Sequence, residues 1–159
     1  MQYQASVVTS DHNFEDAYPT SPTLTTDKTA TVNIIDVDID NLSREELLVR
    51  RDTDGGVVVT PSVDHLMKVQ HDEEFRDVYS AVDYRVCDSK ILMYAAQFLG
   101  TPLCDKISGS DLLPWFCDHN RDNPDVKIYL LGAAPGVAEL AQQRINARIG
   151  REIIVESHS

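Results

Sequence analysis

The sequence predicts an α/β fold in which a Rossmann-like parallel sheet is flanked by helices. Two short apolar runs each end in a polar residue and precede a helical pattern, Val57-Val58-Val59-Thr60 and Tyr84-Arg85-Val86-Cys87-Asp88. Short β-branched runs are typical of buried strands, and residues just past the carboxyl ends of parallel strands face the ligand crevice. Strand and helix patterns alternate along the chain, which favours right-handed crossovers. We therefore expect Thr60 and Asp88 to face one cleft.

Composition bounds the domain organisation and excludes several classes of function. The chain has 159 residues and a net charge of −12, which disfavours a nucleic-acid partner. Residues 1–30 are polar and rich in Ser and Thr, so we expect a disordered tail before a single domain of residues 31–159. No apolar stretch approaches the roughly 20 residues of a membrane-spanning helix, and no signal-peptide pattern opens the chain, so a cytoplasmic location is expected. Three widely spaced cysteines argue against a disulfide framework and against a zinc site.

The first half of the domain contains clear start signals for helices. Ser43 and Glu46 form a capping box, which predicts a helix to about Arg51. Ser62 and Asp72 are suited to capping two further helices. The strands expected in this half are Thr31 to Val37, followed by a turn at Asp38 to Asn41, then Val57 to Thr60, and then Val82 to Cys87.

The second half is predicted to continue the alternation. The helix Ser89 to Leu99 is apolar on most sides, so we expect it to be a central packing helix. Ser110 is the expected cap of the next helix. The remaining elements are a strand at Val126 to Leu131, a turn at Gly132 to Gly136, a helix at Val137 to Ile149 and a strand at Glu152 to Glu156. Because a covering helix is due after that strand, we expect the sheet to be incomplete at the C-terminus, and its open edge favours a homo-oligomer.

For several residues the sequence allows two alternative roles, one chemical and one structural. Asp88 could be a general base, or it could cap the helix that follows it, and position alone favours the cap. Lys106 and the amides at Gly109, Ser110 and Asp111 could hold an anion such as a diphosphate, although a solvated lysine is the commoner case.

The turn from Gly132 through Pro135 to Gly136 would let a phosphate or ribose approach the backbone, but it lacks the spacing of a dinucleotide fingerprint and of a P-loop. His65 and His71 do not share a helical face, so we interpret them as surface residues. The sequence thus predicts no metal and no cofactor.

Five motifs in this order resemble the WecG/TagA/CpsF family of glycosyltransferases over about Val32 to Ser157. They are Val-Thr-Pro-Ser-x-x-x-Leu-Met-Lys (Val59 to Lys68), Asp-Glu-Glu-Phe-Arg (Asp72 to Arg76), Val-Cys-Asp-Ser before an apolar helix (Val86 to Gly100), Asp-Lys-Ile-Ser-Gly-Ser-Asp-Leu-Leu-Pro (Asp105 to Pro114) and Tyr-Leu-Leu-Gly-x-x-Pro-Gly-Val-Ala-Glu (Tyr129 to Glu139).

The resemblance implies inverting transfer of an N-acetylhexosamine-type sugar from a UDP-sugar to a lipid-linked, undecaprenyl-diphosphate acceptor at the inner membrane face, without an obligatory metal. By position, Asp88 matches the family's proposed general base and Thr60 a threonine of the same pocket. Lys106 stands where the family usually has an arginine near the leaving diphosphate. Ser62 replaces an asparagine, and Ser89 replaces a glycine.

The resemblance also implies a substrate-binding set and a further segment. Family members continue past the equivalent of Ser159 into a donor-site motif and a membrane-docking appendage, so peripheral membrane contact is expected only through such a segment. Two alternatives stay open: a non-catalytic module that binds a nucleotide sugar or a partner protein, and a receiver-type signalling domain. The residues expected to bind substrate are Ser62, Lys106, Gly109, Ser110, Gly132, Pro135 and Gly136.

Overall fold

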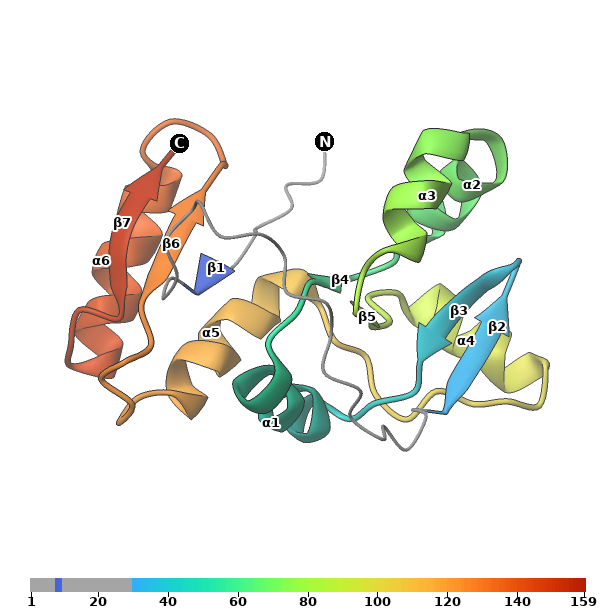
Figure 1. Cartoon of the computed structure of the whole chain (residues 1–159), viewed down its shortest axis with the longest axis horizontal. Coiled ribbons are helices and arrows are strands. Elements are labelled where there is room, and N and C mark those ends of the chain that lie inside the picture. Colours follow the sequence, from blue (N-terminus) through green and yellow to red (C-terminus); the bar gives the residue numbers. More distant parts are fainter. Residues whose placement is uncertain (1–7, 10–29) are drawn as a thin grey trace. The chain divides into compact units, whose positions relative to one another are not determined.

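The computed structural model describes residues 8–9 and 30–159. Within this part, the chain forms two compact units, one of residues 30–109 and one of residues 110–159 with the short strand β1 (Val8–Thr9) (Figure 1). Both units combine helices with strands, so the α/β class predicted from the sequence is confirmed. The tail expected at residues 1–30 lies almost entirely outside the described residues.

The 30–109 unit opens with an antiparallel hairpin of β2 (Thr31–Ile34) and β3 (Val37–Asp40), in which Ile34 pairs with Val37. The prediction of one strand to Val37 followed by a turn was wrong. The reversal occurs at Ile35 and Asp36, whose φ angles are 50° and 58°. Two consecutive positive φ angles make a two-residue hairpin loop, which normally calls for Asn or Gly. Isoleucine at such a position gives no turn signal in the sequence.

Helix α1 (Arg44–Asp54) starts as its capping box predicts. The Ser43 hydroxyl accepts from the Glu46 amide at 3.2 Å, and the Glu46 carboxylate accepts from the Ser43 amide at 2.8 Å. The helix ends at Gly55, where a positive φ of 68° is available to glycine without strain. Local sequence is therefore sufficient to fix this element.

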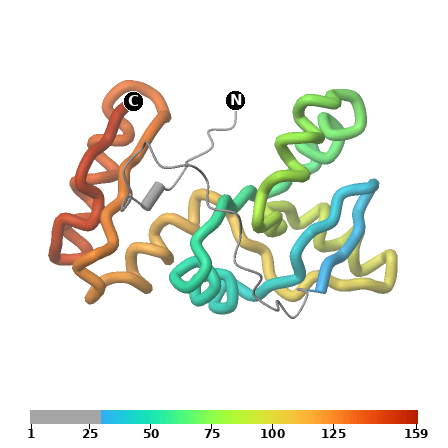
Figure 2. The backbone as a smooth tube through the Cα atoms, viewed as in Figure 1, coloured from blue at the N-terminus to red at the C-terminus, as the bar shows by residue number. Residues whose placement is uncertain are grey.

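A parallel strand pair forms the centre of the 30–109 unit. Strand β4 (Val58–Val59) pairs with β5 (Tyr84–Arg85), and the crossover between them contains α2 (Val63–His71) and α3 (Glu73–Ser80), which Figure 2 traces in green. Asp72 caps α3 by accepting from the Phe75 amide at 2.9 Å, as expected. The hydrophobic core of the unit joins the hairpin, the strand pair and the helices α2, α3 and α4.

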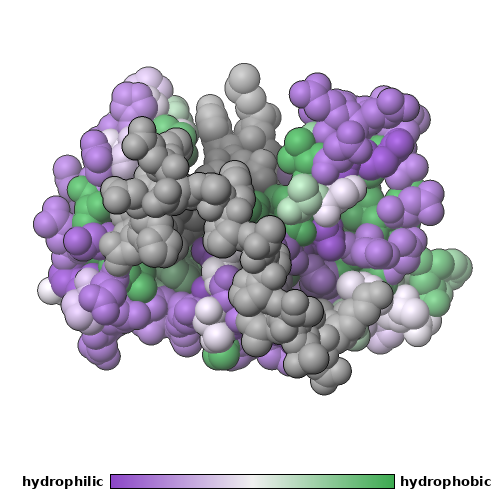
Figure 3. Space-filling model, viewed as in Figure 1, coloured by the Kyte–Doolittle hydropathy of each residue, from purple (hydrophilic) through white to green (hydrophobic). Residues whose placement is uncertain are grey.

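Helix α4 (Lys90–Phe98) lies at the surface of its unit, so the prediction of a central packing helix was wrong. One face packs on β2 and buries Leu92 and Ala96. On the opposite face, Ile91, Tyr94 and Phe98 are 67%, 68% and 92% exposed. Hydrophobic surface is visible beside the end of this helix at the right edge of Figure 3. Helix α4 therefore has more apolar side chains than it buries against the rest of its unit.

The 110–159 unit repeats the strand and helix alternation. Its parallel strands β6 (Ile128–Leu131) and β7 (Ile154–His158) are joined by α6 (Val137–Ile149), and β1 adds antiparallel to β6. Helix α5 (Gly109–His119) begins at Gly109, so Ser110 lies inside the helix and is not its cap. Parallel, Rossmann-like pairing is thus present in part, at β4–β5 and at β6–β7, while the other two pairings are antiparallel.

Candidate active site

The strand pair β4–β5 brings two predicted site residues to one end of the 30–109 unit. Its parallel hydrogen bonding continues past the strands: the Val86 amide donates to Val59 at 3.0 Å, and the Asp88 amide donates to Pro61 at 3.2 Å. The register pairs Val58 with Tyr84, an offset of 26 residues that also sets Ser62 opposite Asp88. Thr60 and Ser62 therefore lie just past one strand and Asp88 just past the other, at the same end of this pair.

Asp88 is accessible and is not occupied as a helix cap. Ser89 is the N-cap of α4, and its hydroxyl accepts from the Ile91 amide at 3.2 Å. The position of Asp88 just before the helix favoured a capping role in the sequence, and that prediction was therefore wrong. The Asp88 side chain is 27% exposed. Because the Asp88 carboxylate lies past the end of a strand and does not cap the helix, it can contact a ligand.

Lys106 is brought to Asp88 by the loop that precedes α5. The Ile107 amide donates to the Cys87 carbonyl at 2.8 Å, which fixes this loop beside the end of β5. The Lys106 ammonium lies 3.8 Å from the Asp88 carboxylate, and its side chain is 33% exposed. A pair this long and this exposed contributes little to stability, roughly 0 to 1 kcal/mol. Both groups therefore stay available to a substrate.

Gly109 approaches the end of β4 closely. A Cβ built on Gly109 would lie 3.2 Å from the Thr60 hydroxyl oxygen, which is tighter than ordinary van der Waals contact. Ser62 occupies the N-cap position of α2, as predicted, but its hydroxyl makes no capping bond. That hydroxyl oxygen is buried and has no hydrogen-bond partner among the described residues. An unsatisfied buried hydroxyl costs about 1 to 3 kcal/mol, so a hydrogen-bond partner for this group would be stabilising.

His65 belongs to the same end of the unit, although its sequence context predicted a surface residue. It lies on the first turn of α2, and its Nδ1 is 2.9 Å from the Tyr79 hydroxyl. Burial lowers the pKa of His65, while the negative charges of Asp64 and, more weakly, Asp88 act in the opposite direction. Burial raises the pKa of Tyr79, so its hydroxyl stays protonated, and it donates to Nδ1 or accepts from it according to the tautomer of the ring. The sequence feature that could have predicted this placement is the position of His65, three residues after Ser62.

The remaining predicted site residues belong to the 110–159 unit. Gly132 and Gly136 have φ angles of 105° and 81°, and Ala133 between them has 76°. No atom lies within 4 Å of a Cβ built on Gly132 or Gly136, so the conformation of this turn, and not crowding, is what calls for glycine. Pro135 is exposed in the same turn. Ser110, in the first turn of α5, is the other member of the set in this unit.

The described part of the chain contains neither a cluster of metal ligands nor a helix that could span a membrane. No group of three or more His, Cys, Asp or Glu side chains there is arranged to hold a metal ion. Among the same residues, every helix is too short or too polar to cross a bilayer.

A carboxylate and a hydroxyl at the carboxyl ends of neighbouring parallel strands are where α/β proteins bind their ligands, so this end of the strand pair is the candidate site. The family model for the WecG/TagA/CpsF glycosyl transferases matches residues 32–159, and the chain belongs to this family. Membership supports glycosyl transfer as the activity, with a sugar donor and an acceptor as substrates. No curated protein matches the chain in sequence.

Proposed function

We propose that this protein is an inverting glycosyltransferase that moves an N-acetylhexosamine-type sugar from a UDP-sugar to a polyprenyl-diphosphate-linked or polysaccharide-precursor acceptor. Family membership supports the transferase class. The sugar, the nucleotide and the acceptor rest on the resemblance of the motifs around Thr60, Asp88 and Lys106. The observation that carries the proposal is Asp88, an accessible carboxylate at a strand end with an ammonium 3.8 Å away.

In the proposed reaction, Asp88 is the general base. Its carboxylate takes the proton of the acceptor hydroxyl while that oxygen attacks the anomeric carbon of the donor. The bond from this carbon to the diphosphate breaks on the opposite side, and the electron pair leaves with UDP. Displacement from the opposite side inverts the configuration of the sugar.

Lys106 offsets the negative charge that grows on the leaving diphosphate. An ammonium placed before the reaction stabilises this charge without further reorganisation. Because Lys106 already lies beside Asp88, it can bind the diphosphate only near the base, where the reacting carbon must be. The amides at Gly109 and Ser110, in the first turn of α5, are proposed to add donors.

Two hydroxyl groups are proposed to orient the substrate. Thr60 and Ser62 lie at the same end of the strand pair as Asp88, and the Ser62 hydroxyl has no partner among the described residues. A sugar hydroxyl would satisfy it. Within the other unit, the turn Gly132 to Gly136 is proposed from its motif alone as a place where a ribose or phosphate could approach the backbone, because neither glycine carries a Cβ.

The test replaces the base and keeps the shape of its side chain. Asp88→Asn should lower transfer from a UDP-sugar by about 10²- to 10⁴-fold, the usual contribution of a general base, and leave circular dichroism and the thermal midpoint unchanged. Asp77→Asn is the matched control, because Asp77 is an exposed carboxylate on α3. Transfer is measured as release of UDP and as labelled product.

Wild-type turnover by a folded Asp88→Asn variant would remove the proposed role of Asp88. Calorimetric titration with UDP and UDP-sugars distinguishes the alternative of a non-catalytic module. Binding of a UDP-sugar without any turnover in the wild type would favour that module over the enzyme.

A further inference from the structure

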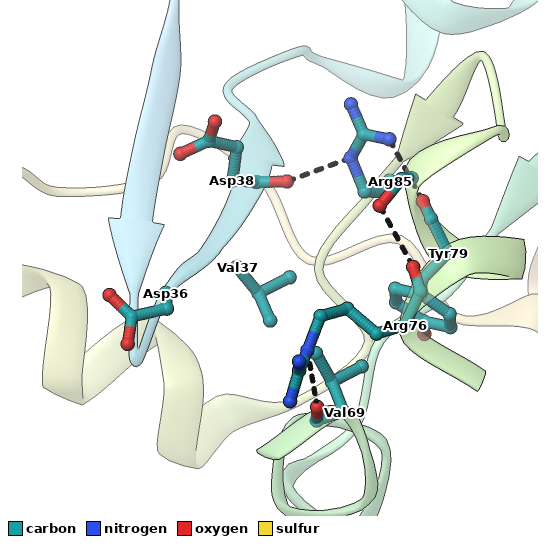
Figure 4. Close-up of a pocket in the computed structure, with 8 residues that line it drawn as sticks. Asp36, Val37, Asp38, Val69, Arg76, Tyr79 and Arg85 are labelled. Carbon is teal, nitrogen blue, oxygen red and sulfur yellow. Dashed lines mark hydrogen bonds between the residues drawn. The ribbon is translucent and has the colours of Figure 1, made fainter. Parts of the chain in front are cut away.

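A cavity of about 250 Å³ lies in the 30–109 unit and contains none of the predicted site residues. Its walls come from the turn before β3 and the start of β3, from α2, from α3 and from the end of β5 (Figure 4). Its volume is below the roughly 300 Å³ at which sites for drug-sized ligands begin. A ligand of this cavity is therefore a small molecule or a single group of a larger one.

Two arginines line this cavity, and neither is neutralised by a carboxylate. Arg76 donates from Nε to the Val69 carbonyl at 3.0 Å and from Nη2 to the Gln70 carbonyl at 3.2 Å. Arg85 donates from Nε to the Asp38 carbonyl at 2.9 Å and from Nη1 to two further carbonyls. All of these acceptors are uncharged. Within the described residues, no ion pair involves either guanidinium.

The two carboxylates that also line the cavity lie on its hairpin side. Figure 4 shows the Asp36 and Asp38 side chains directed away from the Arg85 guanidinium, on the opposite side of the cavity from the helices. One oxygen of Asp38 already accepts from the Asn33 side chain at 2.8 Å. The cavity thus has two arginines on one side and two carboxylates on the other.

Each guanidinium keeps a nitrogen for a ligand. A guanidinium has five N–H donors, and the bonds to carbonyls leave Nη1 of Arg76 and Nη2 of Arg85 without an acceptor among the described residues. The carbonyl bonds fix both side chains, so little further entropy is lost when a ligand binds. Guanidinium donors match the oxygens of carboxylate and phosphate groups in geometry and in charge.

We propose that this cavity is a binding site for a small oxyanion, a carboxylate or phosphate group bound by the guanidinium nitrogens that Arg76 and Arg85 leave without an acceptor. The site is separate from the candidate active site, since the cavity is lined by neither Asp88 nor Lys106. Ser80 lines the same cavity at the end of α3, and its hydroxyl donates to the Arg76 carbonyl at 2.8 Å. This position allows the charge of the cavity to be changed without altering either arginine.

Isothermal titration of the full chain with inorganic phosphate and, separately, with citrate tests the site and distinguishes the two oxyanions. At least one of them should bind with one equivalent per chain. Arg76→Gln and Ser80→Glu should each weaken this binding at least tenfold, the first by removing a donor and the second by adding a negative charge. Arg144→Gln, which removes an exposed charge in the other unit, should change it less than twofold.

Lys106→Gln separates this site from the candidate active site and should also change anion binding less than twofold. Circular dichroism establishes whether each variant is folded. If Arg76→Gln does not fold, the effect of Ser80→Glu on anion binding tests the proposal by itself. Absence of binding of both anions at millimolar concentration would overturn the proposal. Binding that Ser80→Glu leaves unchanged, or that Lys106→Gln abolishes, would overturn it as well.

Discussion

At the scale of single residues, His65 connects the candidate active site to the core of its unit. Its imidazole lies edge-on to the rings of Phe75 and Tyr79, with centroids 5.9 and 6.0 Å away, and bonds to the Tyr79 hydroxyl. Burial is the main reason why its pKa is lowered, and the charges of Asp64 and, more weakly, Asp88 oppose this shift. The ionisation of His65 therefore responds to both carboxylates.

Removal of the Asp88 charge should lower the pKa of His65 further. The carboxylate stabilises the imidazolium, so Asp88→Asn takes away one of the two interactions that oppose burial, the other being the larger one with Asp64. A pH titration of the His65 ring proton followed by NMR measures this pKa, with Asp77→Asn as the control that should leave it unchanged. Equal pKa values in wild type and Asp88→Asn would show that the two groups do not interact.

The same ionisation should make stability depend on pH. Because the pKa of His65 is lower in the folded than in the unfolded protein, the unfolded state binds more protons between these two values. The contribution of neutral His65 is complete above the unfolded pKa of about 6.5 and is lost as pH falls toward the folded pKa. The thermal midpoint should therefore fall more between pH 7.5 and 5.5 in the wild type than in His65→Gln. Parallel curves would contradict this.

At the scale of secondary structure elements, α4 has two apolar faces with different roles. Leu92 is 3% exposed and packs in the core of its unit, whereas Phe98, at the end of the helix, is 92% exposed. Composition does not distinguish these two positions. Only the position of β2 against one face decides which side chains are buried.

Substitutions on the two faces of α4 should differ strongly in their effect on stability. Leu92→Ala leaves a cavity in the core and should lower the free energy of unfolding by about 2 to 5 kcal/mol. Phe98→Ser replaces a side chain that is exposed to solvent, so it should change the free energy of unfolding by less than about 0.5 kcal/mol. Urea denaturation of both variants measures the difference. A large loss in Phe98→Ser would mean that another surface covers this residue.

At the scale of the whole molecule, the chain contains two compact units that each have strands and helices of their own. One buried cysteine lies in each unit, Cys87 in the first and Cys117 in the second, while Cys104 is exposed. Burial raises the pKa of Cys87 and raises that of Cys117 to about 11, so both thiols are unreactive in the folded protein. Each therefore reports on the folding of its own unit.

Thiol labelling in increasing urea should reveal whether residues 31–159 unfold as one domain. With Cys104→Ser to remove the exposed thiol, no labelling is expected in native buffer, and Cys87 and Cys117 should become reactive at different urea concentrations. Mass spectrometry of the labelled peptides identifies each site. Coincident labelling of both thiols would show a single cooperative domain.

The sequence by itself determined the α/β class, the caps at Ser43 and Asp72, and the position of Asp88 at the end of a strand. These features depend on hydrogen bonds and backbone preferences within a few residues, which a contiguous sequence encodes. The family motifs, also local, indicated glycosyl transfer.

Only the tertiary structure decided which surfaces are covered and which side chains meet. The exposed face of α4, the contact of His65 with Tyr79 and the bond from Arg85 to Asp38, 47 residues away, depend on segments distant in the sequence. Burial and charge environment are properties of such pairs of segments, so no local pattern contains them. The hairpin turn at Ile35 belongs here too, because pairing of β2 with β3 stabilises a backbone conformation that isoleucine disfavours by itself.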